Sequence, residues 1–225
     1  KSNREQLLTD NKKIIESIAT ELKKYVSADE KQPLIIMVSN PVDLILNHFI
    51  ESGNFNKKKT IGSGNWLDTN RFKDMISRET GIDPKEIDTI AVAQHGAKIV
   101  YLISKTSAQG KSLQQLGLTE SKIKEIQDKA TNGAQEIIGL LAVKSTTYGP
   151  ALSILDLIQS YVFDKKQLLS ASTYLDGEYG VHGYTLGVPI ILGKNGVEEI
   201  KLFDLSPSEK EEYKNSYEFV LSLEV

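Results

Sequence analysis

The chain has 225 residues, of which 40% are hydrophobic and 25% are charged, so it has the composition of an ordinary globular protein and can bury a sizeable core. Its formal net charge of -3 provides no basic field for nucleic acid, and the absence of cysteine excludes disulfides, thiolate metal ligands and cysteine nucleophiles. No apolar run approaches the roughly 20 residues of a membrane span. We therefore expect a cytoplasmic protein that binds neither nucleic acid nor membrane.

The first part of the chain alternates helix and strand patterns. Residues 5–25 carry apolar side chains at three- and four-residue spacing, which predicts an amphipathic helix. Residues 34–38 form a continuous apolar run of strand length, and both faces of such a strand must be covered, as in the centre of a parallel sheet. A helix over 42–52, ended by Gly53, and a short strand over 59–61 follow.

The middle of the chain predicts longer helices and two flanking strands. Gly81 is suited to end the first of these helices, Thr119 to cap the second, and Pro150 is tolerated only in the first turn of the third. The expected elements are helices over 67–80, 119–141 and 148–163 and strands over 89–93 and 99–104.

The last part of the chain predicts antiparallel strands over 168–175, 184–192 and 197–205. Asn195-Gly196 indicates a tight hairpin turn, which needs positive φ at both central positions. Residues 206–209 begin the final helix with a capping-box pattern. The whole pattern is typical of an α/β half of the nucleotide-binding type followed by an α+β half.

Three stretches contain candidate site residues. Asn40 follows the apolar strand, at the end where open α/β sheets bind ligands, although a turn asparagine before proline is the alternative. Asp68 and Arg71 share one helix face, where a first-turn acid and a surface arginine would also be ordinary. His95 lies between two strands beside a glycine, either as a poised proton donor or as a structural histidine. No group of His, Asp and Glu has metal-ligand spacing, so we expect no metal site.

The order and spacing of six stretches resemble the lactate/malate dehydrogenase family over nearly the whole chain. These stretches are SNPVD, IGSGNWLDTNRF, QHG, STTYGPALS, LDGEYG and LGVPIILGKNGVEEI. The resemblance implies an NAD-dependent 2-hydroxy-acid dehydrogenase that acts on a small 2-oxo or 2-hydroxy acid and forms a homodimer or homotetramer. It also implies a Rossmann-type parallel sheet, whose N-terminal part is missing, in residues 1–64 and an α+β catalytic and substrate domain in residues 65–225.

The same resemblance assigns catalytic and substrate roles. His95 matches the general acid/base, and Asp68 matches the carboxylate that orients the imidazole and should raise its pKa. Arg71 matches the residue that binds the substrate carboxylate through a planar fork. Arg4 matches the mobile-loop arginine that polarises the substrate carbonyl. The implied reaction moves a hydride between C4 of the nicotinamide and the carbonyl carbon, while His95 delivers a proton to the oxygen.

Further positions match pocket and cofactor contacts of the family. Asn40 matches the asparagine that bonds the substrate oxygen near the nicotinamide, and Thr146 matches a position that shapes the substrate pocket. Asn11 matches a cofactor contact, as do the groups around Val38, Ser39 and Asn40. The implied cofactor is NAD.

The chain departs from the family pattern in two places. The family begins with strand–helix units that carry a glycine-rich phosphate loop, and Gly62-Ser63-Gly64 lacks the third glycine of such a loop. We therefore expect about two or three units of some 30 residues each to precede Lys1, and a protein that began there to bind NAD poorly. The family also has an acidic residue before the histidine and Gly-Asp after it, whereas this chain has Gln94-His95-Gly96-Ala97-Lys98, which changes the local charge.

The substrate stays open between malate and lactate, because the family's specificity residue falls before Lys1. SNPVD, GSGNWLDT and Thr146 are typical of lactate dehydrogenases, whereas YGPA, GEYG and GVPIILGKNGVEEI are typical of lactate-dehydrogenase-like malate dehydrogenases. We favour malate/oxaloacetate, with lactate/pyruvate as the alternative. A non-catalytic interaction protein is a further alternative, but the joint presence of Asp68, Arg71 and His95 argues against it.

Overall fold

The computed structural model describes residues 3–27, 29, 31–143 and 145–223, and in the first helix it describes side chains from residue 10 onward. Its helices are α1 (Asn3–Leu22), α2 (Val42–Gly53), α3 (Asn65–Thr80), α4 (Glu120–Leu141), α5 (Tyr148–Val162) and α6 (Pro207–Ser222). Its strands are β1 (Ile35–Met37), β2 (Thr60–Gly62), β3 (Ile87–Asp88), β4 (Ala91–Ala93), β5 (Ile99–Tyr101), β6 (Ser107–Ala108), β7 (Lys111–Ser112), β8 (Gln167–Asp176), β9 (His182–Gly193) and β10 (Gly196–Ile200). Short 3-10 helices occupy Lys57–Lys59, Pro84–Glu86, Ile103–Lys105 and Glu178–Gly180.

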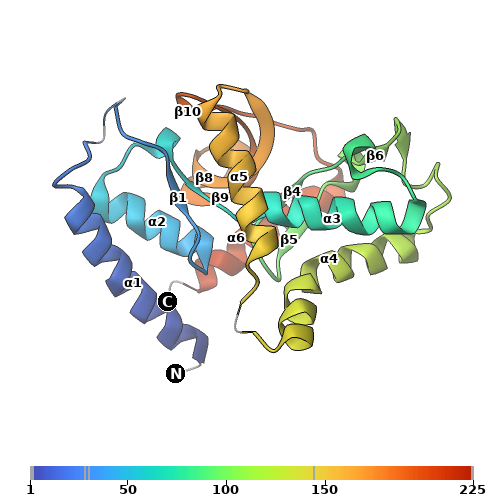
Figure 1. Cartoon of the computed structure of the whole chain (residues 1–225), viewed down its shortest axis with the longest axis horizontal. Coiled ribbons are helices and arrows are strands. Elements are labelled where there is room, and N and C mark those ends of the chain that lie inside the picture. The colour runs from blue at the N-terminus through green and yellow to red at the C-terminus, as the bar shows by residue number, and fades with distance from the viewer. Residues whose placement is uncertain (1–2, 28, 30, 144, 224–225) are drawn as a thin grey trace.

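Over the described residues, a seven-stranded mixed sheet runs through the middle of the molecule in the order β1-β2-β8-β9-β4-β5, with β10 also paired to β9 (Figure 1). β1 and β2 are parallel, and the other pairs of this sheet are antiparallel. A single residue pair, Gly62 with Ser172, joins the parallel pair to β8. The predicted fold class, a parallel α/β part followed by an α+β part, is therefore confirmed.

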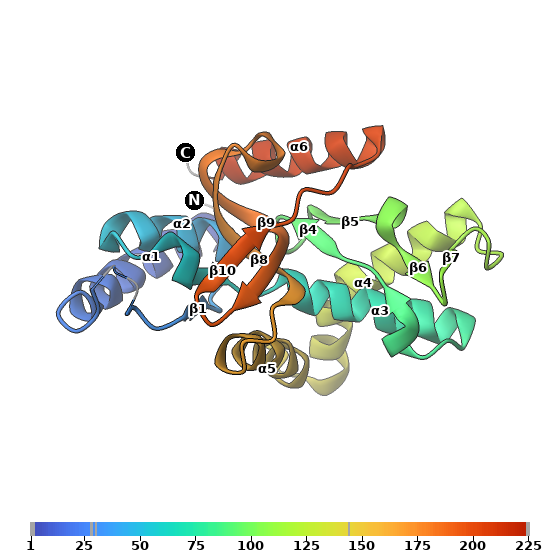
Figure 2. The same cartoon turned by 90° about the horizontal axis from the view of Figure 1, so that it is seen from above.

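Helices cover the sheet on several sides. Figure 2 shows α5 and α6 on opposite sides of β8, β9 and β10. Leu157 of α5 and Tyr213 of α6 are buried in the same apolar core as the strand residues Leu186 and Val188. Burial of such side chains is the main favourable contribution to folding and fixes where the two helices lie.

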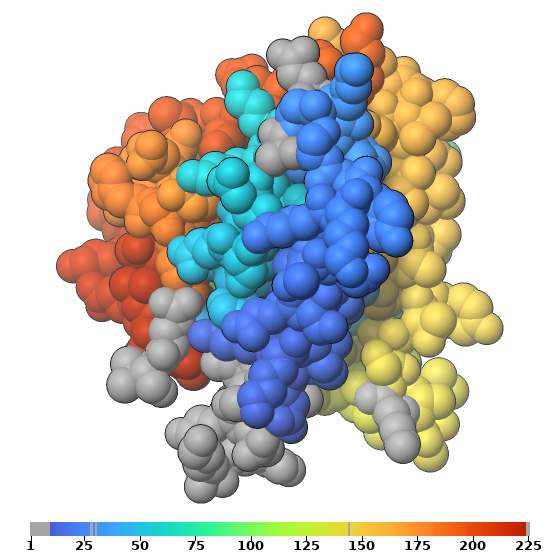
Figure 3. All heavy atoms as spheres, turned by 90° about the vertical axis from the view of Figure 1, so that its left-hand side faces the viewer, coloured from blue at the N-terminus to red at the C-terminus, as the bar shows by residue number. Residues whose placement is uncertain are grey.

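The N-terminal helix lies on the surface over α2. Figure 3 shows α1 at the front of this face, with α2 beside it. Ile15 and Ala19 of α1 are buried against Phe49 of α2. In the described part of the chain, no helix is both long enough and apolar enough to cross a membrane.

Most predicted element boundaries agree with the structure to within a few residues, and three local predictions are wrong. Gly53 is the last residue of α2, but the left-handed C-cap, with φ and ψ of 50° and 41°, is Asn54 rather than Gly53. The residue at this position is a glycine because a Cβ there would lie 1.9 Å from the Phe55 ring. The hairpin turn residues are Lys194 and Asn195, because Gly193 pairs with Gly196, and Gly196 takes a positive φ of 91°.

The third error concerns two strands that end early. β5 ends at Tyr101, and the backbone N–H of Ser104 donates to Glu209 Oε1 at 2.9 Å instead of to a neighbouring strand. β10 ends at Ile200, and the N–H of Phe203 donates to the hydroxyl of Tyr179 at 2.9 Å. Side chains distant in sequence thus satisfy backbone groups that the strand pattern assigned to the sheet.

Candidate active site

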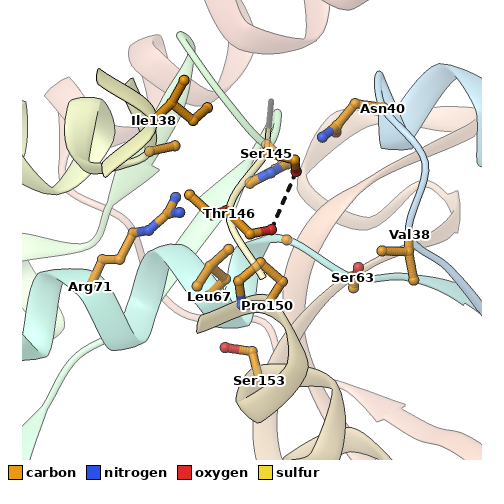
Figure 4. Close-up of a pocket in the computed structure, with 13 residues that line it drawn as sticks. Val38, Asn40, Ser63, Leu67, Arg71, Ile138, Ser145, Thr146, Pro150 and Ser153 are labelled. Carbon is orange, nitrogen blue, oxygen red and sulfur yellow. Dashed lines mark hydrogen bonds between the residues drawn. The ribbon is translucent and has the colours of Figure 1, made fainter. Parts of the chain in front are cut away.

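A cavity of about 240 Å³ opens between the carboxyl end of β1, the start of α3, the second half of α4 and the first turn of α5 (Figure 4). Of the predicted site residues with described side chains, those that line it are Val38, Asn40, Arg71, His95 and Thr146. These positions span more than a hundred residues of sequence, so the fold brings the separate stretches together.

The imidazole of His95 is paired with a buried carboxylate. Its Nδ1 lies 2.6 Å from Oδ2 of Asp68, which is 3% exposed in the first turn of α3. Because Asp68 occupies Nδ1, the other ring nitrogen, Nε2, is the one left for a ligand in the cavity. Burial alone would lower the pKa of His95, but the charge and hydrogen bond of Asp68 outweigh it and raise the pKa above its ordinary value of 6.5.

Arg71 lies one helical turn after Asp68 on the same face of α3. Its Nη1 lies 3.6 Å from Oδ1 of Asp68, a long contact that leaves most of the guanidinium group uncommitted. Figure 4 shows this guanidinium pointing into the cavity. A planar cation in this position can hold a carboxylate through two parallel hydrogen bonds.

Asp43 is a site residue that the sequence patterns did not single out. Its Oδ2 accepts the backbone N–H of His95 at 3.1 Å, and its carbonyl accepts the hydroxyl of Thr185 at 2.6 Å. Burial raises the pKa of Asp43 to about 6, and the hydrogen bonds to its carboxylate only partly oppose this. In sequence it resembles an ordinary first-turn acid of a helix, and its partner lies 52 positions away.

Gly64 lets the backbone approach the ring of His95 closely. Its φ is 129°, and a Cβ there would lie 2.5 Å from Cγ of His95. Gly64 therefore lies directly against the imidazole, where a larger residue would displace the ring. Ala93, two residues before His95, is fully buried with a positive φ of 68°, a conformation that costs an L residue about 1–2 kcal/mol.

The proposed cofactor positions lie near the end of β1. Val38 and Asn40 border the cavity and are exposed, and Asn11 of α1 donates from Nδ2 to the carbonyl of Asn40 at 2.8 Å. Ser39 is exposed and does not line the cavity. Arg4 lies in the first turns of α1, but its side chain is outside the described residues.

The opposite wall comes from α4, α5 and the loop between them. Thr146 lies in this loop, where the Ser145 hydroxyl donates to the Thr146 carbonyl at 3.2 Å (Figure 4). Ile138 of α4 and Pro150 and Ser153 of α5 complete this wall, and sequence reasoning had not assigned them to the site. Their apolar and hydroxyl groups carry no pattern that separates a pocket wall from a helix surface.

Sequence comparison assigns both parts of the chain. Residues 2–62 match the family model of the lactate/malate dehydrogenase NAD-binding domain, and residues 66–222 match that of the lactate/malate dehydrogenase alpha/beta C-terminal domain. The chain belongs to the lactate/malate dehydrogenase family. The resemblance predicted from the sequence stretches is thus confirmed.

Individual relatives agree with this assignment. The chain is 35% identical to malate dehydrogenase of Rhodopirellula baltica, over 98% of this chain and 69% of the relative. It is 38% identical to malate dehydrogenase 1 of Aquifex aeolicus, over 97% of this chain and 64% of the relative. The chain therefore spans about two thirds of the length of these relatives.

Solved structures show the same fold. The malate dehydrogenase of Cryptosporidium parvum superposes with a TM-score of 0.90 at 35% identity, covering 98% of this chain and 70% of that one. The lactate dehydrogenase of Eimeria maxima, solved with NADH and oxamate, gives a TM-score of 0.91 at 30% identity, covering 100% of this chain and 70% of that one.

Proposed function

We propose that this chain is the catalytic part of an NAD-dependent dehydrogenase that interconverts L-malate and oxaloacetate. The observation that carries the proposal is the His95–Asp68 pair in the wall of a cavity that also receives Arg71. We further propose that residues 1–64 belong to the NAD-binding domain and residues 65–225 form the catalytic and substrate domain.

His95 holds the proton in this reaction. With Nδ1 bonded to Asp68, its Nε2 donates the proton to the carbonyl oxygen of the 2-oxo acid during reduction and takes it from the hydroxyl during oxidation. The Asp68 carboxylate stabilises the imidazolium form, which the raised pKa of His95 reflects. We assign His95 and Asp68 as the proton-transferring pair.

Arg71 binds the carboxylate next to the reacting carbon, and Thr146 and Asn40 shape the cavity around it. An arginine fork fixes the plane of that carboxylate and so orients the carbonyl toward His95. Arg4 is proposed to polarise the carbonyl oxygen, as the family resemblance implies. Together these cations offset the negative charge of the substrate.

The cavity fits the reactive end of a nicotinamide cofactor. Asn40, Val38 and Ser39 follow the carboxyl end of a parallel strand, the place where open α/β sheets bind dinucleotides, and Asn11 holds the Asn40 turn. Its volume of about 240 Å³ suits a small acid beside a single ring rather than a whole dinucleotide. NAD, when bound, accepts or supplies the hydride at the nicotinamide ring. These 225 residues contain no glycine-rich phosphate loop, so activity is to be measured with the complete gene product.

Malate is favoured because the curated relatives described above are named malate dehydrogenases. Lactate is the second candidate, because lactate dehydrogenases are among the similar structures and Thr146 is typical of that group. Oxidation of NADH by the complete gene product with oxaloacetate and with pyruvate decides between them. The His95→Asn variant should abolish turnover of the preferred acid. Turnover of pyruvate alone would overturn the malate assignment, and turnover of neither acid would overturn the dehydrogenase assignment.

We also propose a homo-oligomer of two or four chains. α5 exposes a row of apolar side chains, with Leu152 64%, Leu155 45% and Val162 61% exposed, and such a surface favours association. The molar mass from light scattering tests this, and a monomer at working concentration would contradict it. The cytoplasmic location predicted from composition is tested by fractionating cells that express the complete gene product.

A further inference from the structure

The turn that presents His95 is closed by a side chain next to it. Gln94 is 8% exposed and folds back across the turn between β4 and β5. Its Nε2 donates to the carbonyl of His95 at 2.6 Å, and its Oε1 accepts the N–H of Lys98 at 3.0 Å. One carboxamide thus links the first and last parts of the turn.

The amide of Gln94 satisfies both contacts at once. The His95 carbonyl can only accept and the Lys98 N–H can only donate, so the bridging group must do the opposite at each end. A hydrocarbon at position 94 would leave both backbone groups unpaired. The bridge is tight, because the Nε2 of Gln94 lies 3.0 Å from where a Cβ of Gly96 would be.

The same turn is tied to the C-terminal helix. The backbone N–H of Gln94 donates to Oγ of Ser216 at 3.0 Å, and Nζ of Lys98 lies 5.9 Å from the ring centre of Phe219. These contacts hold both ends of the turn on α6. The turn therefore has an anchor outside the cavity that is independent of Asp68.

We propose that Gln94 is a positioning residue for His95, a role that rests on the proposed function of that histidine. Three hydrogen bonds fix the position of His95. Asp68 binds Nδ1 of the ring, Asp43 accepts the backbone N–H, and Gln94 donates to the backbone carbonyl. Loss of the third bond lets the peptide plane rotate, and this moves Nε2 relative to the substrate. Displacements of about 1 Å at a reacting group can reduce rates by roughly 100-fold.

The test compares Gln94→Leu with the wild-type complete gene product. Gln114→Leu, at an exposed loop residue, is the matched control for the loss of a carboxamide. We expect Gln94→Leu to lower kcat about 10- to 100-fold with the KM for NADH near the wild-type value. Amide hydrogen exchange at Lys98 should become faster in this variant, while exchange in β8 and β9 stays slow. The control should change none of these quantities.

Three results would overturn the proposal. The first is wild-type kcat in Gln94→Leu, and the second is unchanged exchange at Lys98 in that variant. The third is a fall in activity that matches the loss of folded protein, as measured by exchange in β8 and β9. If the wild type reduces neither oxaloacetate nor pyruvate, the proposed function fails, but exchange at Lys98 still shows whether Gln94 braces the turn.

Discussion

Replacing Asp68 with asparagine is the sharpest test of the proton-transfer assignment. The substitution keeps the size of the side chain and an oxygen that can accept from His95 Nδ1, but it removes the charge that stabilises the imidazolium. The bond between these groups is 2.6 Å long, and Asp68 is 3% exposed, so water screens it little. The change therefore isolates the electrostatic contribution of one buried carboxylate.

The size of the effect follows from the strength of such a bond. A hydrogen bond to a charged partner contributes about 1.5–3 kcal/mol, which corresponds to a roughly 10- to 150-fold lower kcat for reduction of the 2-oxo acid. Because burial would then act on His95 without the opposing carboxylate, the pKa of His95 should fall. The pH at which reduction loses half its rate should therefore also fall.

The assay is NADH oxidation by the complete gene product across a pH series. Asp74→Asn is the matched control, because Asp74 lies on the same helix and its pair with Arg78 is exposed to solvent. An exposed pair of this kind contributes about 0–1 kcal/mol, so the control should keep wild-type kcat and pH profile. Wild-type kcat in Asp68→Asn with an unchanged profile would refute the reasoning.

Four other results are expected. In the wild type, the kcat/KM for reduction should fall as pH rises through the raised pKa of His95, and oxidation should rise over the same window because it needs the neutral ring; a flat profile in both directions would count against His95. Arg71→Lys keeps the charge but loses the planar guanidinium fork, so the KM for oxaloacetate should rise about 10-fold or more while the KM for NADH stays unchanged. An equal rise in the two KM values would contradict binding of the substrate carboxylate by Arg71. Asp43→Ala leaves the buried N–H of His95 without its acceptor and should lower the free energy of unfolding in urea by about 1–3 kcal/mol, whereas wild-type stability would show that this bond is dispensable. Gly64→Ala places a Cβ 2.5 Å from Cγ of His95 at a φ of 129°, so melting temperature and kcat should both fall, and retention of both would show that the ring can move aside.

Much of the fold and part of the site could be predicted from local patterns. The capping box of Ser206 and Glu209, the N-cap Thr119 and the left-handed Gly81 each mark a helix end through contacts within a few residues. His95, Asp68, Arg71, Asn40 and Thr146 were found because each lies in a short stretch that resembles one family. Interactions of this range are visible in sequence because both partners lie in the same window.

Contacts between distant segments could not be predicted in this way. No local pattern pairs Asp43 with the N–H of His95, assigns Gly64 to the space beneath the ring, or ends β5 because Glu209 accepts the N–H of Ser104. In the sequence, Gln94 was noted only as a departure from the family motif. Its two side-chain hydrogen bonds depend on the folded turn between β4 and β5, which the sequence pattern does not specify.

The sequence by itself thus determined where most helices and strands lie, which family the motifs resemble and which side chains are proposed to carry the chemistry. Periodicity, caps and motif residues depend on neighbours along the chain. The tertiary structure alone decided how the site is held in place. The backbone donors and acceptors around His95 are satisfied by groups from α2, α6 and the turn itself, and the free energy of burial sets the distances between those elements.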